Sequence, residues 1–171
     1  MESGVSSFGS TRPRTLGILG AGRVGTAFDT LDPDALAGKV VVDAMNYWHE
    51  TDGNIAALAA AASSSEMLQE FLVGARLVKT LNHIGYHELE SDHSPAGTPG
   101  RRALAVAGDD AAARAVVMAL VEHLGYDAVD AGVLADGVVL EPGTEIFTGS
   151  HDRAGLEALL AAHSRQEDAN A

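Results

Sequence analysis

Apolar runs that suit buried strands alternate with amphipathic segments along most of the chain. Strands are expected over residues 15–19, 39–44, 75–81, 102–107 and 127–130, where apolar side chains predominate. Helices are expected over residues 23–31, 110–124 and 155–163. Repeated βα units with buried strands predict an α/β fold: a doubly wound (Rossmann-like), mostly parallel sheet with helices on both faces.

Polar residues at fixed offsets mark the helix ends. Ser63 and Glu66 have the spacing of a capping box, ahead of a helix that should stop at Gly74. Asp109 is expected to cap the helix over 110–124, and Asp32-Pro33 to stop the helix over 23–31. Apolar residues recur at helical spacing within 110–124 and therefore predict core packing: Ala113, Val116, Val117, Leu120, Val121 and Leu124.

The composition is typical of a globular protein. The 171 residues are 46% hydrophobic, and no apolar run approaches the ~18 residues that a membrane-spanning helix needs. We expect one domain over residues 15–165 after a disordered tail over residues 1–14, which has no apolar core of the kind found in secretory signals. A cytoplasmic location is therefore expected. The absence of cysteine excludes disulfides, thiolate metal sites and cysteine nucleophiles.

The net charge of −13 argues against a nucleic-acid or anionic-membrane surface, because both need clustered Lys and Arg. Lys39 and Lys79 are the only lysines. A polyanionic ligand would therefore depend on backbone N–H groups and a few arginines, of which Arg23 and the pair Arg101-Arg102 are candidates. The alternative for Arg101-Arg102 is a solvated entry to a strand.

The strongest motif is GxGxxG, formed by Gly20, Gly22 and Gly25 between the first strand and a helix-compatible segment. Gly20 allows a tight turn, Gly22 lets the backbone approach a pyrophosphate, and Gly25 lets the helix pack closely on the strand. The N–H groups of the helix N-terminus would then face the anion. A glycine turn that merely packs is the alternative.

Histidines and aromatic residues follow two of the predicted strands. His83 and His87 have the spacing of metal ligands on a helix, but Glu88 and Glu90 are the only third ligands at hand, so substrate contact or a solvated loop is favoured and no metal is predicted. Tyr47, Trp48 and Tyr86 could flank a planar ring or pack in the loops. No motif of a hydrolase accompanies them.

Five segments together resemble one family. They are GILGAGRVGTAF, LAGKVVVDAMNYW, SSSEMLQEFLVGARLVKTLNHIGYHEL, PGRRALAVAGDDAAARAVVMALVEHLGYDAVDAG and VLEPGTEIFTG. In this order, over about residues 15–149, they are similar to the NADPH-dependent coenzyme F420 reductases and related NADP oxidoreductases. The resemblance implies an NADP-dependent oxidoreductase that transfers hydride between NADP(H) and a second carrier, such as the deazaflavin coenzyme F420, or a small carbonyl or imine substrate.

The resemblance also implies a cofactor site in an NAD(P)-binding domain. It puts the pyrophosphate on Gly20, Ala21, Gly22, Arg23 and Val24, with Gly25 completing the motif. Asn46 and Asn82 would lie near the nicotinamide, and both follow strands directly, where an open α/β sheet places its ligand. Turn formation is the equal alternative for these asparagines. No catalytic acid or base is predicted, because hydride transfer needs mainly positioning.

The chain departs from the family pattern after Phe28. Before Leu36, on the order of 50 residues that would form further βα units are absent, and with them the region that reads the ribose and its 2′-phosphate. The predicted sheet is therefore a truncated one, in which residues 39–44 could pair beside residues 15–19. Its exposed edge favours a homodimer or aggregation.

Two questions stay open at this point: the role of Asp43 and the function of the protein. The spacing of Asp43 from Gly25 suits a ribose ligand of NAD, whereas the alignment of KVVVDAMN favours a structural or loop-anchoring carboxylate. The function itself is either that of the oxidoreductase or that of a non-catalytic, dinucleotide-binding remnant of the family.

Overall fold

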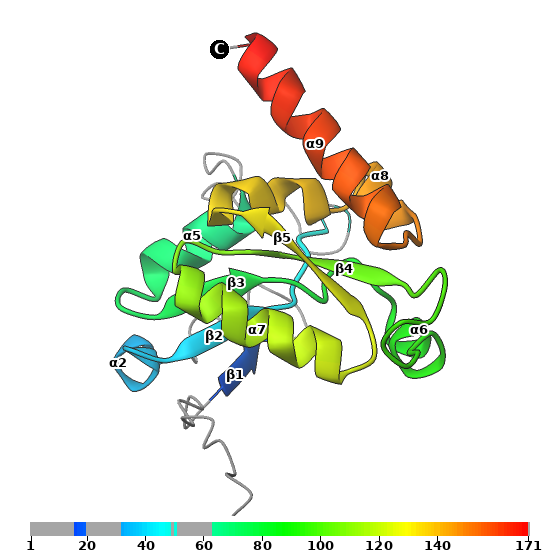
Figure 1. The fold of residues 1–171 in the computed structure, drawn as a ribbon. Helices are drawn as coiled ribbons and strands as arrows, with labels where there is room; N and C mark the ends of the chain where they lie inside the picture. The colour runs from blue at the N-terminus through cyan, green and yellow to red at the C-terminus, as the bar shows by residue number, and fades with distance from the viewer. Residues whose placement is uncertain (1–15, 20–31, 49, 51–62, 171) are drawn as a thin grey trace, which may run out of the picture.

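A computed structural model describes residues 16–19, 32–48, 50 and 63–170 (Figure 1). Its sheet has five strands in the order β1-β2-β3-β4-β5. They are β1 (Leu16–Leu19), β2 (Val40–Asp43), β3 (Arg76–Lys79), β4 (Ala103–Ala107) and β5 (Asp127–Gly132). All five predicted strands are therefore confirmed, and no boundary differs from the prediction by more than two residues.

The sheet consists of two parallel sets that meet at β3 and β4. Strands β1, β2 and β3 are parallel, and Leu19 pairs with Asp43, which pairs with Lys79. Strands β4 and β5 are parallel to each other, but β4 runs antiparallel to β3 and joins it at the single pair Lys79–Ala107. The predicted pairing of residues 39–44 beside residues 15–19 is confirmed, and the sheet is mostly parallel.

Successive residues of the strands face opposite cores, as the pleat of a strand requires. Val40 and Val42 of β2 share a core with α7 (Ala111–His123), in which Ala113, Val117 and Val121 are buried. Val41, between them, packs on the other face with Leu68 of α5 (Ser64–Phe71). Helices therefore cover both faces of the sheet.

The face that carries α5 is completed beside β4 and β5 by three more elements. They are the 3₁₀ helix η2 (Leu134–Leu140), α8 (Glu145–Thr148) and α9 (Arg153–Asn170). Leu140, Ile146 and Leu156 supply their buried contacts with the strands. Helix α9 runs beyond the predicted 155–163, and its last turns extend away from the body (Figure 1).

One prediction about a helix cap was wrong. The cap of α7 is Asp110, whose carboxylate accepts from the Ala113 N–H at 2.8 Å, while Asp109 accepts from the Leu134 N–H at 2.9 Å. Asp32 caps the short helix α2 (Pro33–Leu36), in which proline takes the first helical position that suits it. The helix predicted over 23–31 lies outside the described residues.

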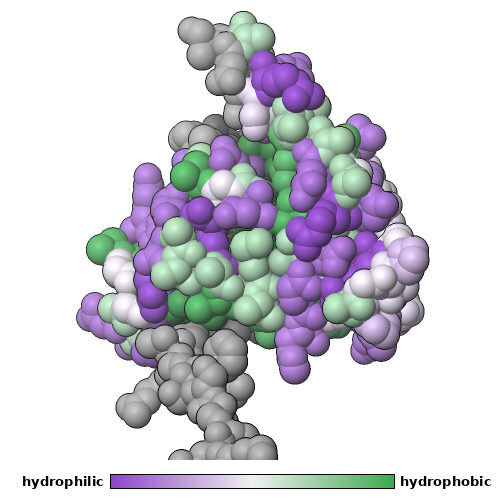
Figure 2. Space-filling model, viewed as in Figure 1, coloured by the Kyte–Doolittle hydropathy of each residue, from purple (hydrophilic) through white to green (hydrophobic). Residues whose placement is uncertain are grey.

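The capping interaction at Ser63 is confirmed. Ser63 Oγ accepts from the Glu66 N–H at 3.1 Å and lies 3.1 Å from Glu66 Oε2, and Gly74 follows the helix with a φ of +86°. The exposed side of α7 consists largely of alanines, namely Ala111, Ala112, Ala115 and Ala119, which form part of the pale green surface in Figure 2. Among the helices described, none has the length and apolarity needed to cross a membrane.

Candidate functional site at the carboxyl ends of β1, β2 and β3

The register of the three parallel strands determines where the candidate site lies. Leu19, Asp43 and Lys79 are level, so β1, β2 and β3 end together at one edge of the sheet. Asn46 lies three residues beyond the end of β2, and Asn82 lies three residues beyond the end of β3. This equal spacing brings the two predicted asparagines together, and they bond to each other.

Both asparagine side chains take part in this contact. Asn82 Nδ2 donates to Asn46 Oδ1 at 2.9 Å, and Asn46 Nδ2 donates to the backbone oxygen of Asn82 at 2.8 Å. Asn82 Nδ2 also donates to the carbonyl of Leu140 at 2.6 Å. Asn82 is buried and Asn46 is half-buried, so Asn46 is the more accessible of the pair.

His83, considered in the sequence as a metal ligand or loop residue, lies behind Asn82 with 4% of its surface exposed. Its Nε2 accepts from the backbone N–H of Ala105 at 3.1 Å, and its Nδ1 lies 3.2 Å from Asn82 Oδ1. Burial, reinforced by the charges of Arg102 and Lys79 and by His151, lowers the pKa of His83 from 6.5 to about 3. The ring is therefore neutral near neutral pH, with its proton on Nδ1.

Asp43 anchors the start of the loop that carries Asn46. One carboxylate oxygen accepts from the Met45 N–H at 2.9 Å, and the other accepts from Ser65 Oγ at 2.7 Å and from Lys79 Nζ at 3.1 Å. Lys79 also donates to the carbonyl of Met45 at 2.5 Å. This geometry is that of a loop-anchoring carboxylate, the alternative that the alignment favoured over a ribose ligand.

The 3₁₀ helix η2 closes the inner side of this site. Gly137 lies so close to Lys79 that an added Cβ would be 3.4 Å from the lysine Cβ and Cγ atoms. Just beyond η2, Glu141 Oε1 accepts from the Ser64 N–H at 3.1 Å and from Ser64 Oγ at 2.7 Å. These contacts hold the Leu140 carbonyl against Asn82. Sequence patterns did not indicate this contact.

The predicted aromatic residues take two different positions. Trp48 meets Phe147 of α8 edge to face, with 5.6 Å between ring centroids, and 43% of Trp48 stays exposed. Tyr86 opens α6 (Tyr86–Ser91), is exposed, and lies against the ring of His87 at 3.9 Å. Trp48 and its neighbour Tyr47 therefore both lie on the loop that carries Asn46.

Arg101 and Arg102 are neither solvated nor open to a phosphate, in contrast to both sequence interpretations. They are 4% and 8% exposed, and each pairs with two carboxylates that are themselves partly exposed. Arg102 pairs with Glu88 and Asp92, and Arg101 pairs with Glu122 at 2.7 Å and Asp127 at 2.8 Å. Burial alone would lower the pKa of Arg101, but these two carboxylates outweigh it and raise that pKa above its usual value.

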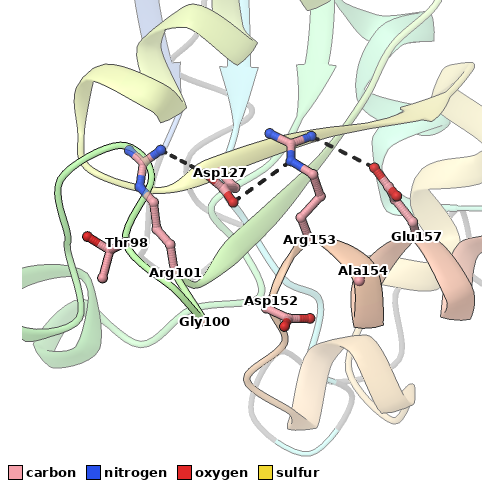
Figure 3. Close-up of a pocket in the computed structure, with 8 residues that line it drawn as sticks. All are labelled: Thr98, Gly100, Arg101, Asp127, Asp152, Arg153, Ala154 and Glu157. Carbon is pink, nitrogen blue, oxygen red and sulfur yellow. Dashed lines mark hydrogen bonds and ion pairs between the residues drawn. The ribbon is translucent and has the colours of Figure 1, made fainter.

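A cavity of about 270 Å³ lies beside Arg101 and Arg153 (Figure 3). Its guanidinium groups are already engaged: Arg101 binds carboxylates and the carbonyls of Ser94, Gly125 and Glu122, and Arg153 binds the Ala128 carbonyl and Glu122. Within the described part of the chain, no group of three or more His, Asp or Glu side chains could hold a metal ion. The cavity therefore has the character of a surface hollow between ion pairs.

The predicted pyrophosphate residues, Gly20 to Gly25, lie outside the described residues. The structure places two parts of the site. They are strand β1, which leads into the glycine motif, and the pair Asn46 and Asn82, which follow β2 and β3. The sequence did not indicate that His83 is buried and bonds to Asn82 and Ala105. Its place directly after Asn82, at the end of a mostly apolar run, was a usable signal for a buried ring.

Comparisons with known proteins bear on the fold. No protein-family model matches the chain, and no curated protein matches it significantly. It is similar to the solved structure of a hypothetical protein from Sinorhizobium meliloti, with 26% identity and a TM-score of 0.55, over 74% of this chain and 63% of that one. Another similar structure is that of a protein from Arthrobacter sp. FB24 proposed to be an F420-dependent NADP reductase, with 28% identity and a TM-score of 0.48, over 80% of this chain and 55% of that one.

The chain therefore spans less than two thirds of the length of either structure. Its own architecture defines the class of protein: an α/β, Rossmann-like fold with a mostly parallel sheet, helices on both faces, and polar side chains at the carboxyl ends of parallel strands. In such sheets this edge is where ligands bind.

Proposed function

We propose that the protein is an NADP-dependent oxidoreductase. It would transfer hydride between NADP(H) and a second carrier, such as the deazaflavin coenzyme F420, or a small carbonyl or imine substrate. The observation that carries the proposal is the level ending of β1, β2 and β3, because the GxGxxG motif follows Leu19 directly in the sequence. Gly20, Ala21, Gly22, Arg23, Val24 and Gly25 would hold the pyrophosphate at that edge.

The side chains at the edge fit a nicotinamide ring. Asn46 and Asn82 are neutral amides, and the carboxylate of Asp43 beneath them is already engaged by Lys79, Ser65 and the Met45 N–H. When bound, NADPH supplies the hydride. The protein then has to bind and orient the ring against the acceptor. The hydride step itself uses no acid–base dyad, and the proton that completes the reduction of the acceptor would come from solvent.

The first test is a titration of the protein with NADPH, followed by the fluorescence of the reduced nicotinamide. We expect saturable binding at micromolar protein. The variant Gly22→Glu should abolish it, because a carboxylate would stand where the phosphates approach the backbone. The matched control is Ala161→Glu, which adds the same charge at an exposed position of α9 and should bind as the wild type does.

An affinity unaffected by Gly22→Glu would move the site elsewhere in the protein. The enzyme proposal fails if neither NADPH nor NADH gives a saturable signal up to millimolar concentration.

One observation favours the second candidate, a non-catalytic, dinucleotide-binding remnant of the same family. In a complete doubly wound sheet, the first strand has neighbours on both sides. The further strands would therefore lie on the side of β1 that faces away from β2. Among the strands that the structure describes, β1 lies at one edge of the sheet, with β2 as its neighbour. We propose that this chain lacks the βα units that follow Phe28 in the family pattern. The region that reads the ribose and its 2′-phosphate would then be absent. Weak binding without preference between NADPH and NADH, and no hydride transfer, would support this candidate.

A further inference from the structure

We propose that His83 and Asn82 are positioning residues, and that they present Asn46 as the side chain that recognises the carboxamide of a nicotinamide ring. This inference rests on the proposed function, which brings a nicotinamide dinucleotide to the same edge. It goes further by separating the two asparagines into one that contacts the ligand and one that does not, and by giving His83 a role.

The orientation of each amide is fixed by groups that can only donate or only accept. The Ala105 N–H donates to His83 Nε2, so the neutral ring carries its proton on Nδ1 and donates to Asn82 Oδ1. At its other end, Asn82 faces the Leu140 carbonyl, which can only accept and therefore requires Nδ2 there. Two independent contacts thus agree on the orientation of the Asn82 amide.

The orientation of Asn46 follows from that of Asn82. Asn82 Nδ2 donates to Asn46 Oδ1, so this oxygen must face Asn82. The Asn82 backbone carbonyl accepts from Asn46 Nδ2, which requires the same orientation. The chain of bonds from Ala105 through His83 and Asn82 therefore leaves Asn46 no freedom to exchange its oxygen and nitrogen.

Counting the remaining hydrogen-bonding capacity separates the two asparagines. Both N–H groups of Asn82 are used, and Asn82 is buried. Among the described residues, Asn46 has partners for one of its two N–H groups and one of the two lone pairs of its oxygen, and it is half-buried. Asn46 is thus the member of the pair with a donor and an acceptor left for a ligand.

A primary carboxamide is the complement of that pair of groups, because it offers one acceptor oxygen and one N–H₂ donor. A ring that bears an acetyl group instead has the same shape and charge but lacks the donor. The lone pair of Asn46 Oδ1 would then lose its partner, and a lost hydrogen bond of this kind weakens binding by about fivefold.

The test measures the dissociation constants of NADP⁺ and of its 3-acetylpyridine analogue by calorimetry. We expect the wild type to prefer NADP⁺ by about fivefold. Asn46→Ala should bind the two nucleotides equally, because the group that distinguishes them is gone. An Asn46→Ala variant that keeps the full preference would overturn the inference.

Two variants of His83 separate a positioning role from a merely structural one. His83→Asn places an amide nitrogen near the position of Nδ1 and can still donate to Asn82, whereas His83→Gln keeps an acceptor near Nε2 for Ala105 and loses the bond to Asn82. We expect His83→Asn to retain the preference for NADP⁺ and His83→Gln to lose it. If both variants keep the ratio of the two constants, or both lose it, His83 does not act through Asn82.

The free protein gives a second readout, which needs no ligand. Nitrogen NMR of the imidazole should show a neutral ring with Nδ1 protonated and Nε2 bare, and the opposite tautomer would overturn the inference.

The outcomes of the binding measurements also separate the two proposals. If NADP⁺ and the analogue bind equally to the wild type, the oxidoreductase proposal stands and this inference fails, whereas if neither binds, both fail.

Discussion

Burial decides which charge and which orientation single side chains of this protein can adopt. Among the described residues, His83 has no acidic partner and is therefore neutral, whereas Arg101 keeps its charge because Glu122 and Asp127 face it. Lys79 is as buried as His83, but it pairs with Asp43. Each of these buried cations thus keeps its charge beside a carboxylate within ion-pair distance.

The neutral state of His83 makes the protein sensitive to acid. The pKa of His83 is about 3 in the folded protein and 6.5 in a free side chain, so between these values the unfolded chain binds the proton and the folded protein does not. The free energy of unfolding should therefore fall as the pH drops below about 6.5, by up to about 1.4 kcal/mol per pH unit. We expect His83→Gln to lose this part of the pH dependence.

Urea unfolding at about pH 7 and about pH 5 measures the effect, which should amount to roughly 2 kcal/mol more acid destabilisation in the wild type than in His83→Gln. His93→Gln, at an exposed position, serves as the control and should follow the wild type. Equal pH dependence in the wild type and His83→Gln would mean that His83 takes up a proton in the folded state.

Helix caps and short connections position the elements around the site. Asp110 caps α7, while its neighbour Asp109 accepts from the N–H of Leu134, the first residue of η2. Glu141 follows η2 and binds Ser64, the first residue of α5. The 3₁₀ helix is therefore tied at both ends, which keeps the Leu140 carbonyl in place beneath Asn82.

The cap of α7 can be tested on its own. Asp110→Ala removes the acceptor of the Ala113 N–H and should lower the free energy of unfolding by about 1 kcal/mol. Asp110→Ser, which restores a capping oxygen, should recover most of that loss. The measurement is urea unfolding at one pH, and an Asp110→Ser variant as unstable as Asp110→Ala would show that the cap is not the source of the loss.

At the scale of the whole molecule, the two faces of the sheet depend on helices from different parts of the chain. Helix α7 covers one face, and the other is shared between α5 near β2 and the C-terminal elements near β4 and β5. Leu156 is the fully buried residue through which α9 enters that second core. The C-terminal helix is thus part of the folded unit at its beginning, although its end extends outward.

Leu156→Ala tests whether α9 stabilises the sheet. The lost contacts and the cavity left behind should lower the free energy of unfolding by about 2–5 kcal/mol. Val73→Ala, a comparable truncation at an exposed position, should change it by less than about 0.5 kcal/mol. A loss at Leu156 no larger than that at Val73 would mean that α9 does not stabilise the rest of the fold.

The sequence by itself determined the strands, the principal helices and the α/β class. These features depend on local patterns: Val40 to Val42 form a β-branched apolar run typical of a strand buried on both faces, and Ser63 has its capping partner three residues away. The sequence also predicted that Asn46 and Asn82 follow strands, because strand ends can be read from polarity.

Tertiary structure alone decided the direction of β4, the partners of Arg101 and Arg102, and the bonds that link His83, Asn82 and Asn46. Each depends on residues far apart in the chain, such as Ala105 with His83 or Leu140 with Asn82. A local pattern shows that a side chain is polar, but it does not show which distant group will satisfy it. That choice is made when the strands pair in register and exclude water, since a buried polar group must then bond to whatever the fold brings beside it.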